Sequence, residues 1–239
     1  MCIRDRLKPE IVSFHFGLPE PALLKRVKAA GCIVISSATV VREAIWLEEH
    51  GADAVIAQGA EAGGHRGMFL TENIAEQPGT FALVPQVVDA VKIPVIAAGG
   101  IADGRGIAAA FALGAAGVQI GSAYLRCPES KVIAPARTAL AQARDDSTVI
   151  TNVMTGRPAR GIANRVMREV GPISADAPHF PHAATGLAPL KAASEKLGRL
   201  DFTNLWAGQA VRLGREMPAA ELTRALAGAA LARLSHLAG

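Results

Sequence analysis

The chain has 239 residues, of which 50% are hydrophobic and 4% aromatic, and its formal net charge at pH 7 is +4. This length and hydrophobicity indicate a globular protein with a sizeable core, either one or two ordinary domains or a single α/β barrel. Lysine and arginine residues are scattered and are not interleaved with aromatic residues, which argues against a nucleic-acid partner, whereas an anionic small ligand fits the modest positive charge.

The three cysteines, Cys2, Cys32 and Cys127, are far apart and have no CxxC spacing, which argues against a disulfide framework or a zinc site. No apolar run reaches the ~18 residues of a membrane span, and no signal peptide is visible. We therefore predict a cytoplasmic protein without a membrane partner. Residues 1–6, MCIRDR, show neither strand nor helix-cap pattern, and we interpret them as a non-native tail.

The next 120 residues predict a regular alternation of strands and helices. Strands are expected at residues 11–16, 32–37, 52–57, 93–98 and 118–120, and helices at 20–30, 39–49, 81–91 and 103–113. Thr39 and Asp103 are the predicted N-caps of two of these helices. Such an order implies parallel strands with right-handed crossovers, so the loops that follow the strands converge on one rim of the sheet.

From Ser147 onward the alternation stops. A strand or extended linker is expected at 148–154, a basic loop plus helix at 157–168, a loop rich in proline, alanine and histidine at 172–189, and helices at 190–197, 203–215 and 219–238. We predict three parts on this basis: a β/α barrel region at 7–146, a small mixed or helical domain at 147–205, and C-terminal helices at 206–239 that return to the barrel.

The strand count leaves two architectures open. A closed barrel of this type needs eight strands, and the alternating region supplies five. An open doubly wound sheet can be built from five. If the barrel is correct, the first strands are absent from the chain.

The segment Gln58–Gly67, QGAEAGGHRG, follows the third predicted strand and places His65 in a glycine-rich loop. At such a position a histidine serves as a general base or as a donor to an anion, and the alternative is a purely structural role. Glu61 and Arg66 are interpreted as loop charges or as parts of a salt bridge. His15 is either directed into the barrel or a hydrogen-bonded core residue.

Two further glycine-containing loops, AAGGI at 97–101 and GSA at 121–123, follow the last two predicted strands. Backbone N–H groups of glycine and a nearby helix N-terminus are typical of a site for a flavin or sugar phosphate. The alternative is that these glycines only allow the turns. The pair His179 and His182 has no third ligand, so no metal is expected, and Arg157 and Arg160 either bind an anion or cover the base of a barrel.

Together the segments resemble the nitronate monooxygenases, formerly called 2-nitropropane dioxygenases. The resemblance runs from about Val12 to Gly208 and rests on AVIAQGAEAGGHRG, PVIAAGGIADGRGIAAAFALGAAGVQIGSAYL, TGRPARGIANRV and LWAGQA. It implies an FMN-dependent TIM-type (β/α)8 barrel with a small, mainly helical second domain. The implied reaction is the oxidation of alkyl or propionate nitronates by O2 to carbonyl compounds and nitrite.

By this likeness His65 is the catalytic histidine, which takes the α-proton of a nitroalkane or holds the anionic nitronate. Flavin contacts are expected at Gln58, Gly63, Gly64 and Ala98 and at the phosphate-binding positions Gly99, Gly100, Gly121 and Ser122.

The resemblance also implies an incomplete barrel. The five predicted strands match strands four to eight of the family, and nothing here matches the first family strand, which carries an AP-M-like segment against the flavin. Because an open parallel sheet exposes unpaired edges, we expect this chain to aggregate and to bind FMN poorly. Near-stoichiometric FMN in a soluble monomer would contradict that expectation.

Two other functions remain as alternatives. FMN-containing enoyl-ACP reductases share the GGH loop and the barrel but use NAD(P)H, and the segments LWAGQA and TGRPAR favour the monooxygenase. The alternative of another class is an inactive fragment, or a barrel that only binds a phosphate ligand.

Overall fold

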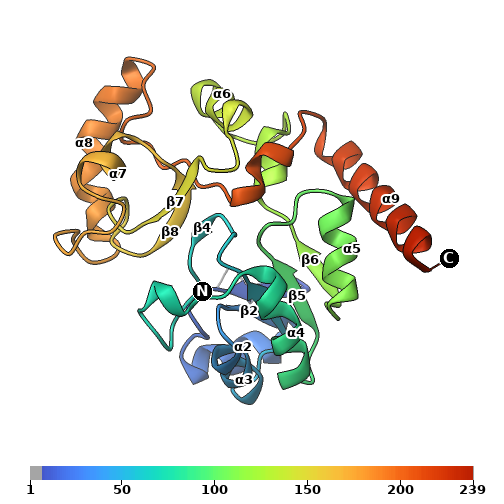
Figure 1. Ribbon diagram of the computed structural model, residues 1–239. Helices are drawn as coiled ribbons and strands as arrows, with labels where there is room; N and C mark the ends of the chain where they lie inside the picture. The colour runs from blue at the N-terminus through green and yellow to red at the C-terminus, as the bar shows by residue number, and fades with distance from the viewer. Residues whose placement is uncertain (1–6, 239) are drawn as a thin grey trace. The chain divides into compact units, whose positions relative to one another are not determined.

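The computed structural model describes residues 7–238, so the predicted non-native tail at 1–6 lies outside the described residues. The chain forms two compact units (Figure 1). The first, here called the sheet unit, contains the described residues up to Ala60 together with Gly67–Ala98 and Ala109–Gln119. The second unit contains Glu61–Arg66, Gly99–Ala108 and the described residues from Ile120 onward.

The sheet unit is built on a five-stranded parallel sheet. Its strands are β1 (Ile11–Phe14), β2 (Ile33–Ala38), β3 (Ala54–Gln58), β5 (Val95–Ala98) and β6 (Gly117–Gln119), adjacent in the order β1-β2-β3-β5-β6. A doubly wound sheet reverses its strand order at a switch point, whereas consecutive barrel strands are neighbours throughout. The observed order is therefore the barrel-type winding, although the described strands do not close into a ring.

Helices cover this sheet as the alternation predicted. They are α2 (Pro21–Ala29), α3 (Val41–Glu49) and α4 (Thr80–Ala90), with the 3-10 helix η1 (Ile74–Glu76); α5 (Gly104–Ala112) follows β5. Helix α3 packs on β2 and β3, and α4 packs on β3 and β5 (Figure 1). The central strand β3 is buried along its whole length, which explains the apolar run that precedes its last residue, Gln58.

The second unit contains a three-stranded antiparallel sheet with the order β4-β8-β7. Its elements are β4 (Gly64–His65), β7 (Thr148–Thr151), β8 (Ala159–Ile162), α6 (Ala134–Gln142), α7 (Arg165–Glu169), α8 (His182–Lys196), α9 (Ala219–Ala238) and the 3-10 helices η2 (Ser122–Arg126) and η3 (Gln209–Leu213). The domain boundaries predicted at 146 and 205 stay a prediction. No described helix is long and apolar enough to cross a membrane.

Several local predictions were wrong, mostly where long-range contacts override sequence preference. The segment predicted as a loop at 172–189 ends in helix α8, which begins at His182 and whose Leu187 packs on the apolar cluster around Met154. Part of the predicted basic loop forms strand β8, and only Gln209–Leu213 of the predicted helix 203–215 is helical, as a 3-10 turn.

The two predicted N-caps had different outcomes. Asp103 is confirmed, because its Oδ1 accepts hydrogen bonds from the N–H groups of Arg105 at 2.9 Å and Gly106 at 3.2 Å. Thr39 is not a cap, since Val40 occupies that position. Instead, the Thr39 N–H and hydroxyl donate to the Glu43 carboxylate at 2.7 and 2.8 Å.

Candidate functional site

Gln58 ends the central strand β3 and is buried, with 7% of its surface exposed. Its side-chain Oε1 accepts a hydrogen bond from the Gly67 N–H at 2.8 Å, and its backbone carbonyl accepts one from the Gln77 amide at 3.0 Å. The amide therefore closes the base of the glycine-rich loop, a role that an apolar residue at this strand end cannot fill. In the sheet register Gln58 lies opposite Ala98.

His65 is held in β4, which pairs with β8 by placing His65 opposite Ala159. This is a correction, because the sequence predicted an irregular loop here. The half-buried ring contacts three side chains of the second unit: Nε2 lies 2.9 Å from Thr155 Oγ1, and the ring centroid lies 5.5 Å from the centroids of both Phe180 and Trp206. None of these three contacts was predicted, since their partners lie at least 90 residues further along the chain.

The glycine pair preceding His65 has two distinct physical requirements. A Cβ on Gly63 would lie 2.5 Å from the Gly208 nitrogen and 2.6 Å from the Ala207 carbonyl carbon, so only glycine allows this approach of two backbones. Gly64 has φ +78°, and no described atom lies within 4 Å of its Cβ position. The Gln209 N–H donates to the Glu61 carbonyl at 3.0 Å, so the LWAGQ segment anchors the loop.

Replacing Gly63 with alanine is expected to destabilise the chain by about 1–3 kcal/mol, because the new methyl group overpacks against rigid backbone. The measurement is the free energy of unfolding from denaturant titration. Gly186 in α8 is the matched control, since a Cβ there meets nothing within 4 Å, and its change to alanine should stabilise the helix slightly. Equal stabilities for the two variants would contradict the packing argument.

The predicted phosphate-binding residues occupy two turns. Gly99 and Gly100 follow β5 with φ values of +113° and +68°, a backbone conformation that favours glycine. A Cβ on Gly121 would meet no described atom within 4 Å. The Ser122 hydroxyl oxygen accepts a hydrogen bond from the Gly208 N–H at 2.8 Å, which directs the hydroxyl proton towards a different acceptor.

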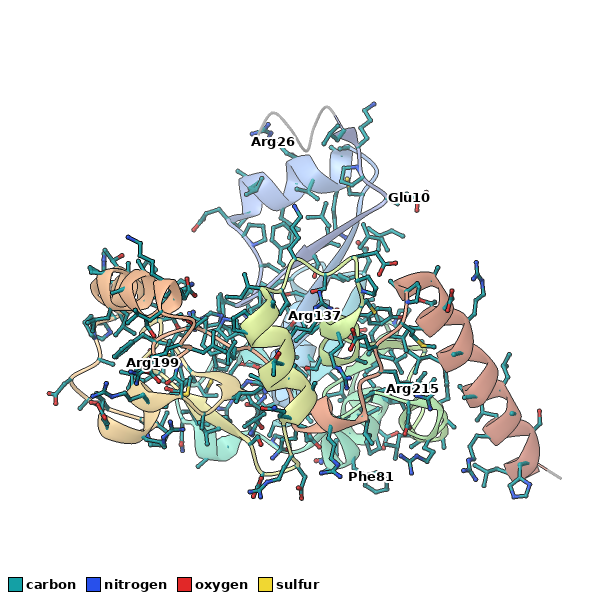
Figure 2. The ribbon with its side chains drawn as sticks, turned by 90° about the horizontal axis from the view of Figure 1, so that it is seen from above. Glu10, Arg26, Phe81, Arg137, Arg199 and Arg215 are labelled. Atoms are coloured by element: carbon teal, nitrogen blue, oxygen red, sulfur yellow. The ribbon has the colours of Figure 1, made fainter. Side chains whose placement is uncertain are left out.

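Arg137 lies on α6 (Figure 2) and anchors a segment that follows Ser122. Its guanidinium donates hydrogen bonds to the carbonyl oxygens of Arg126 at 2.7 Å, Cys127 at 3.0 Å and Ser130 at 3.1 Å. The five-donor fork of arginine suits such clustered carbonyl acceptors. The chain that leaves η2 is therefore held by a side chain of the same unit.

Arg66 is fully buried, which corrects its interpretation as a solvated loop charge. Its guanidinium donates to the carbonyl oxygens of Ala62 at 2.7 Å and Gly64 at 3.4 Å. Burial, together with the nearby Arg160 guanidinium, lowers the pKa of Arg66 to about 9, and the Glu61 carboxylate opposes the shift. Arg66 thus shapes the loop around His65 from inside the protein.

The other histidine candidates are His15 and the pair His179 and His182. His15 follows β1 as an exposed residue of the sheet unit, and its Nδ1 lies 3.1 Å from Ser37 Oγ. A Cβ on Gly67 would lie 3.0 Å from the His15 ring. Within residues 7–238 no group of three or more histidine, cysteine or acidic residues is arranged to hold a metal ion, and this includes His179 and His182.

The family model and the curated relatives indicate the same family. The nitronate monooxygenase family model matches residues 2–228. Proteins described as probable nitronate monooxygenase in Staphylococcus aureus strains MSSA476 and JH9 are 43% identical over 210 residues, which is 87% of this chain and 59% of each relative. The chain therefore spans less than two thirds of the length of these relatives.

Two solved structures superpose on most of this chain. A nitroalkane oxidase from Streptomyces ansochromogenes superposes with a TM-score of 0.91 at 40% identity, covering 99% of this chain and 68% of that one. FabK from Thermotoga maritima superposes with a TM-score of 0.79 at 32% identity, covering 100% and 73%. These matches confirm the predicted α/β fold class and the resemblance noted in the sequence: the chain belongs to the nitronate monooxygenase family.

Proposed function

We propose that this chain acts in the FMN-dependent oxidation of alkyl or propionate nitronates by O2, which yields carbonyl compounds and nitrite. The observation that carries the proposal is the fixed position of His65, paired through β4 and bonded to Thr155, in a member of this family. The proposed reactants are a small anionic nitronate and O2, and the proposed location is the cytoplasm.

The second unit has features that fit a flavin phosphate. Gly64 and Gly121 leave space where a side chain would stand, and Gly99 and Gly100 form a turn that exposes backbone to a ligand. Ser122 has a hydroxyl proton to donate, and we assign these residues and Gly63 to the flavin. The same proposal assigns flavin contacts to Gln58 and Ala98 of the sheet unit. FMN, when bound, supplies the redox chemistry between nitronate and O2.

In the proposed reaction His65 handles charge and protons. The neutral imidazole takes the α-proton of a nitroalkane, and the protonated ring donates a hydrogen bond to an anionic nitronate. The rings of Phe180 and Trp206 limit the directions that the imidazole can take. We expect this restriction to orient the reacting nitrogen.

The test is oxygen consumption and nitrite formation by this chain with a nitronate, at FMN concentrations high enough to saturate the weak binding that an open sheet implies. Turnover that requires FMN supports the proposal. If FMN binds but no turnover is seen at any FMN concentration, the alternative of a protein that only binds a phosphate ligand is favoured.

The phosphate assignment has its own expected result. Replacing Ser122 with alanine should weaken FMN binding about tenfold or more, because a charge-assisted hydrogen bond is lost. Riboflavin, which lacks the phosphate, is the control ligand. It should bind the variant and the parent chain with the same affinity, because it does not make that bond. Fluorescence titration of both flavins measures this difference, and an equal loss for both would contradict a phosphate contact at Ser122.

The second candidate is an FMN-dependent enoyl reductase that uses NAD(P)H. The likeness to FabK supports it, but at lower identity and TM-score than the nitroalkane oxidase match. NAD(P)H consumption by the FMN-loaded chain separates the two candidates.

A further inference from the structure

The Thr155 hydroxyl contacts two groups at once. Its oxygen lies 2.9 Å from His65 Nε2 and 3.2 Å from the carbonyl oxygen of Arg157. Thr155 itself is buried, with 7% of its surface exposed. Both partners belong to the second unit, so the arrangement is internal to one compact body.

The two contacts together limit where the imidazole proton lies. The Arg157 carbonyl oxygen can only accept, so both contacts are hydrogen bonds only when the single hydroxyl proton of Thr155 points to Arg157 and Nε2 carries the imidazole proton. With that assignment the lone pair of the neutral ring is on Nδ1.

The surroundings prevent Thr155 from giving up this arrangement easily. The next residue, Gly156, has φ +89° and donates its N–H to the Asn152 carbonyl at 2.7 Å. The Asn152 side chain is tied in turn to the Ser174 backbone by two hydrogen bonds of 2.8 and 2.9 Å. The turn that presents the hydroxyl is therefore fixed at both its backbone and its side chains.

We propose that Thr155 is a positioning residue that fixes the Nε2–H tautomer of His65, so that Nδ1 is the atom that exchanges protons with the substrate. The proposal rests on the proposed function, in which His65 is the reacting group. In the proton-transfer step the α-carbon proton of a neutral nitroalkane bonds to Nδ1. The C–H electron pair stays with the substrate, which becomes the nitronate, and His65 becomes the imidazolium.

If Nδ1 is the reacting atom, the turnover of two forms of the substrate should depend on the tautomer to different degrees. A neutral nitroalkane needs the Nδ1 lone pair, so its turnover depends on the tautomer. A preformed nitronate has already lost that proton, and its oxidation depends on the tautomer less. A threonine that only filled space would affect both substrates equally or neither.

The structural test is a ¹⁵N–¹H correlation spectrum of the histidine-labelled chain at a pH at which the rings are neutral, because the two tautomers give different patterns. The His65→Gln variant identifies the His65 signals by their loss. We expect the Nε2–H pattern in the parent chain and in Thr155→Ser, and a mixture or the Nδ1–H pattern in the isosteric Thr155→Val. An Nδ1–H pattern in the parent chain, or no change in Thr155→Val, would overturn the proposal.

The kinetic test uses the same variants with saturating FMN. In Thr155→Val, kcat for a neutral nitroalkane should fall about ten- to hundredfold, as is typical when the group that orients a reacting or ligating histidine is lost. KM should change little, the nitronate rate should fall less, and Thr155→Ser should retain the parent rates. Equal losses for both substrates would overturn the positioning role. Because the spectrum needs no turnover, a chain with the expected tautomers but no activity would count against the proposed function alone.

Discussion

Replacing His65 with asparagine is expected to lower kcat/KM for a neutral nitroalkane by about 10²–10⁴-fold, the usual contribution of a positioned general base. Asparagine retains a donor and an acceptor but cannot take a proton at neutral pH. Oxidation of a preformed nitronate should fall by a smaller factor, since only an electrostatic contact is lost. Steady-state rates with both substrates, at saturating FMN, measure the difference.

The matched control is His236→Asn, because His236 is exposed near the end of α9. That variant should keep the parent activity and stability. Full nitroalkane turnover in His65→Asn would show that the reaction does not use this histidine. If His65→Asn does not unfold cooperatively, the same measurement is made on His65→Gln, because its longer side chain also reaches towards Thr155.

The largest stability effect is expected at Glu43 in α3, which is fully buried. Its Oε2 accepts hydrogen bonds from the N–H and hydroxyl of Thr39, and its Oε1 accepts from the N–H groups of Phe69 at 2.6 Å and Leu70 at 3.0 Å. The carboxylate thus ties the start of α3 to the chain that follows Gly67. Truncation leaves buried N–H donors without an acceptor.

Glu43→Ala should therefore cost about 3–5 kcal/mol of unfolding free energy. This is a large share of the ~5–15 kcal/mol by which a typical domain is stable. Glu49 lies on the same helix but is exposed, and Glu49→Ala should change stability by only about 0.5 kcal/mol. Similar midpoints and slopes in denaturant titrations of the two variants would contradict a stabilising role for the buried Glu43 carboxylate.

The sequence predicted the sheet unit well because its information is local. Apolar runs of strand length alternate with helical segments, and the five parallel strands are found close to their predicted positions. The cap at Asp103 also depends only on residues within three positions. Local periodicity and turn chemistry are sufficient for such features.

The surroundings of His65 could not be predicted in the same way. Strand β4 has two residues and exists because β8, more than 90 residues later, supplies its hydrogen-bond partners. Trp206, which contacts the ring, lies in the segment LWAGQA. That segment indicated the family but gave no sign of a contact with His65. Likewise, the local sequence around Arg66 is typical of a surface loop, and its burial follows from tertiary packing that a local pattern does not reveal.

The central claim, nitronate oxidation by the FMN-loaded chain, is tested most directly by mixing it anaerobically with a nitronate and, separately, with NADPH. Flavin absorbance is followed in a stopped-flow instrument. We expect rapid bleaching of the flavin by the nitronate and little bleaching by NADPH on the same timescale. Rapid bleaching by NADPH alone, with none by the nitronate, would contradict this expectation and assign the chain to the reductase chemistry instead.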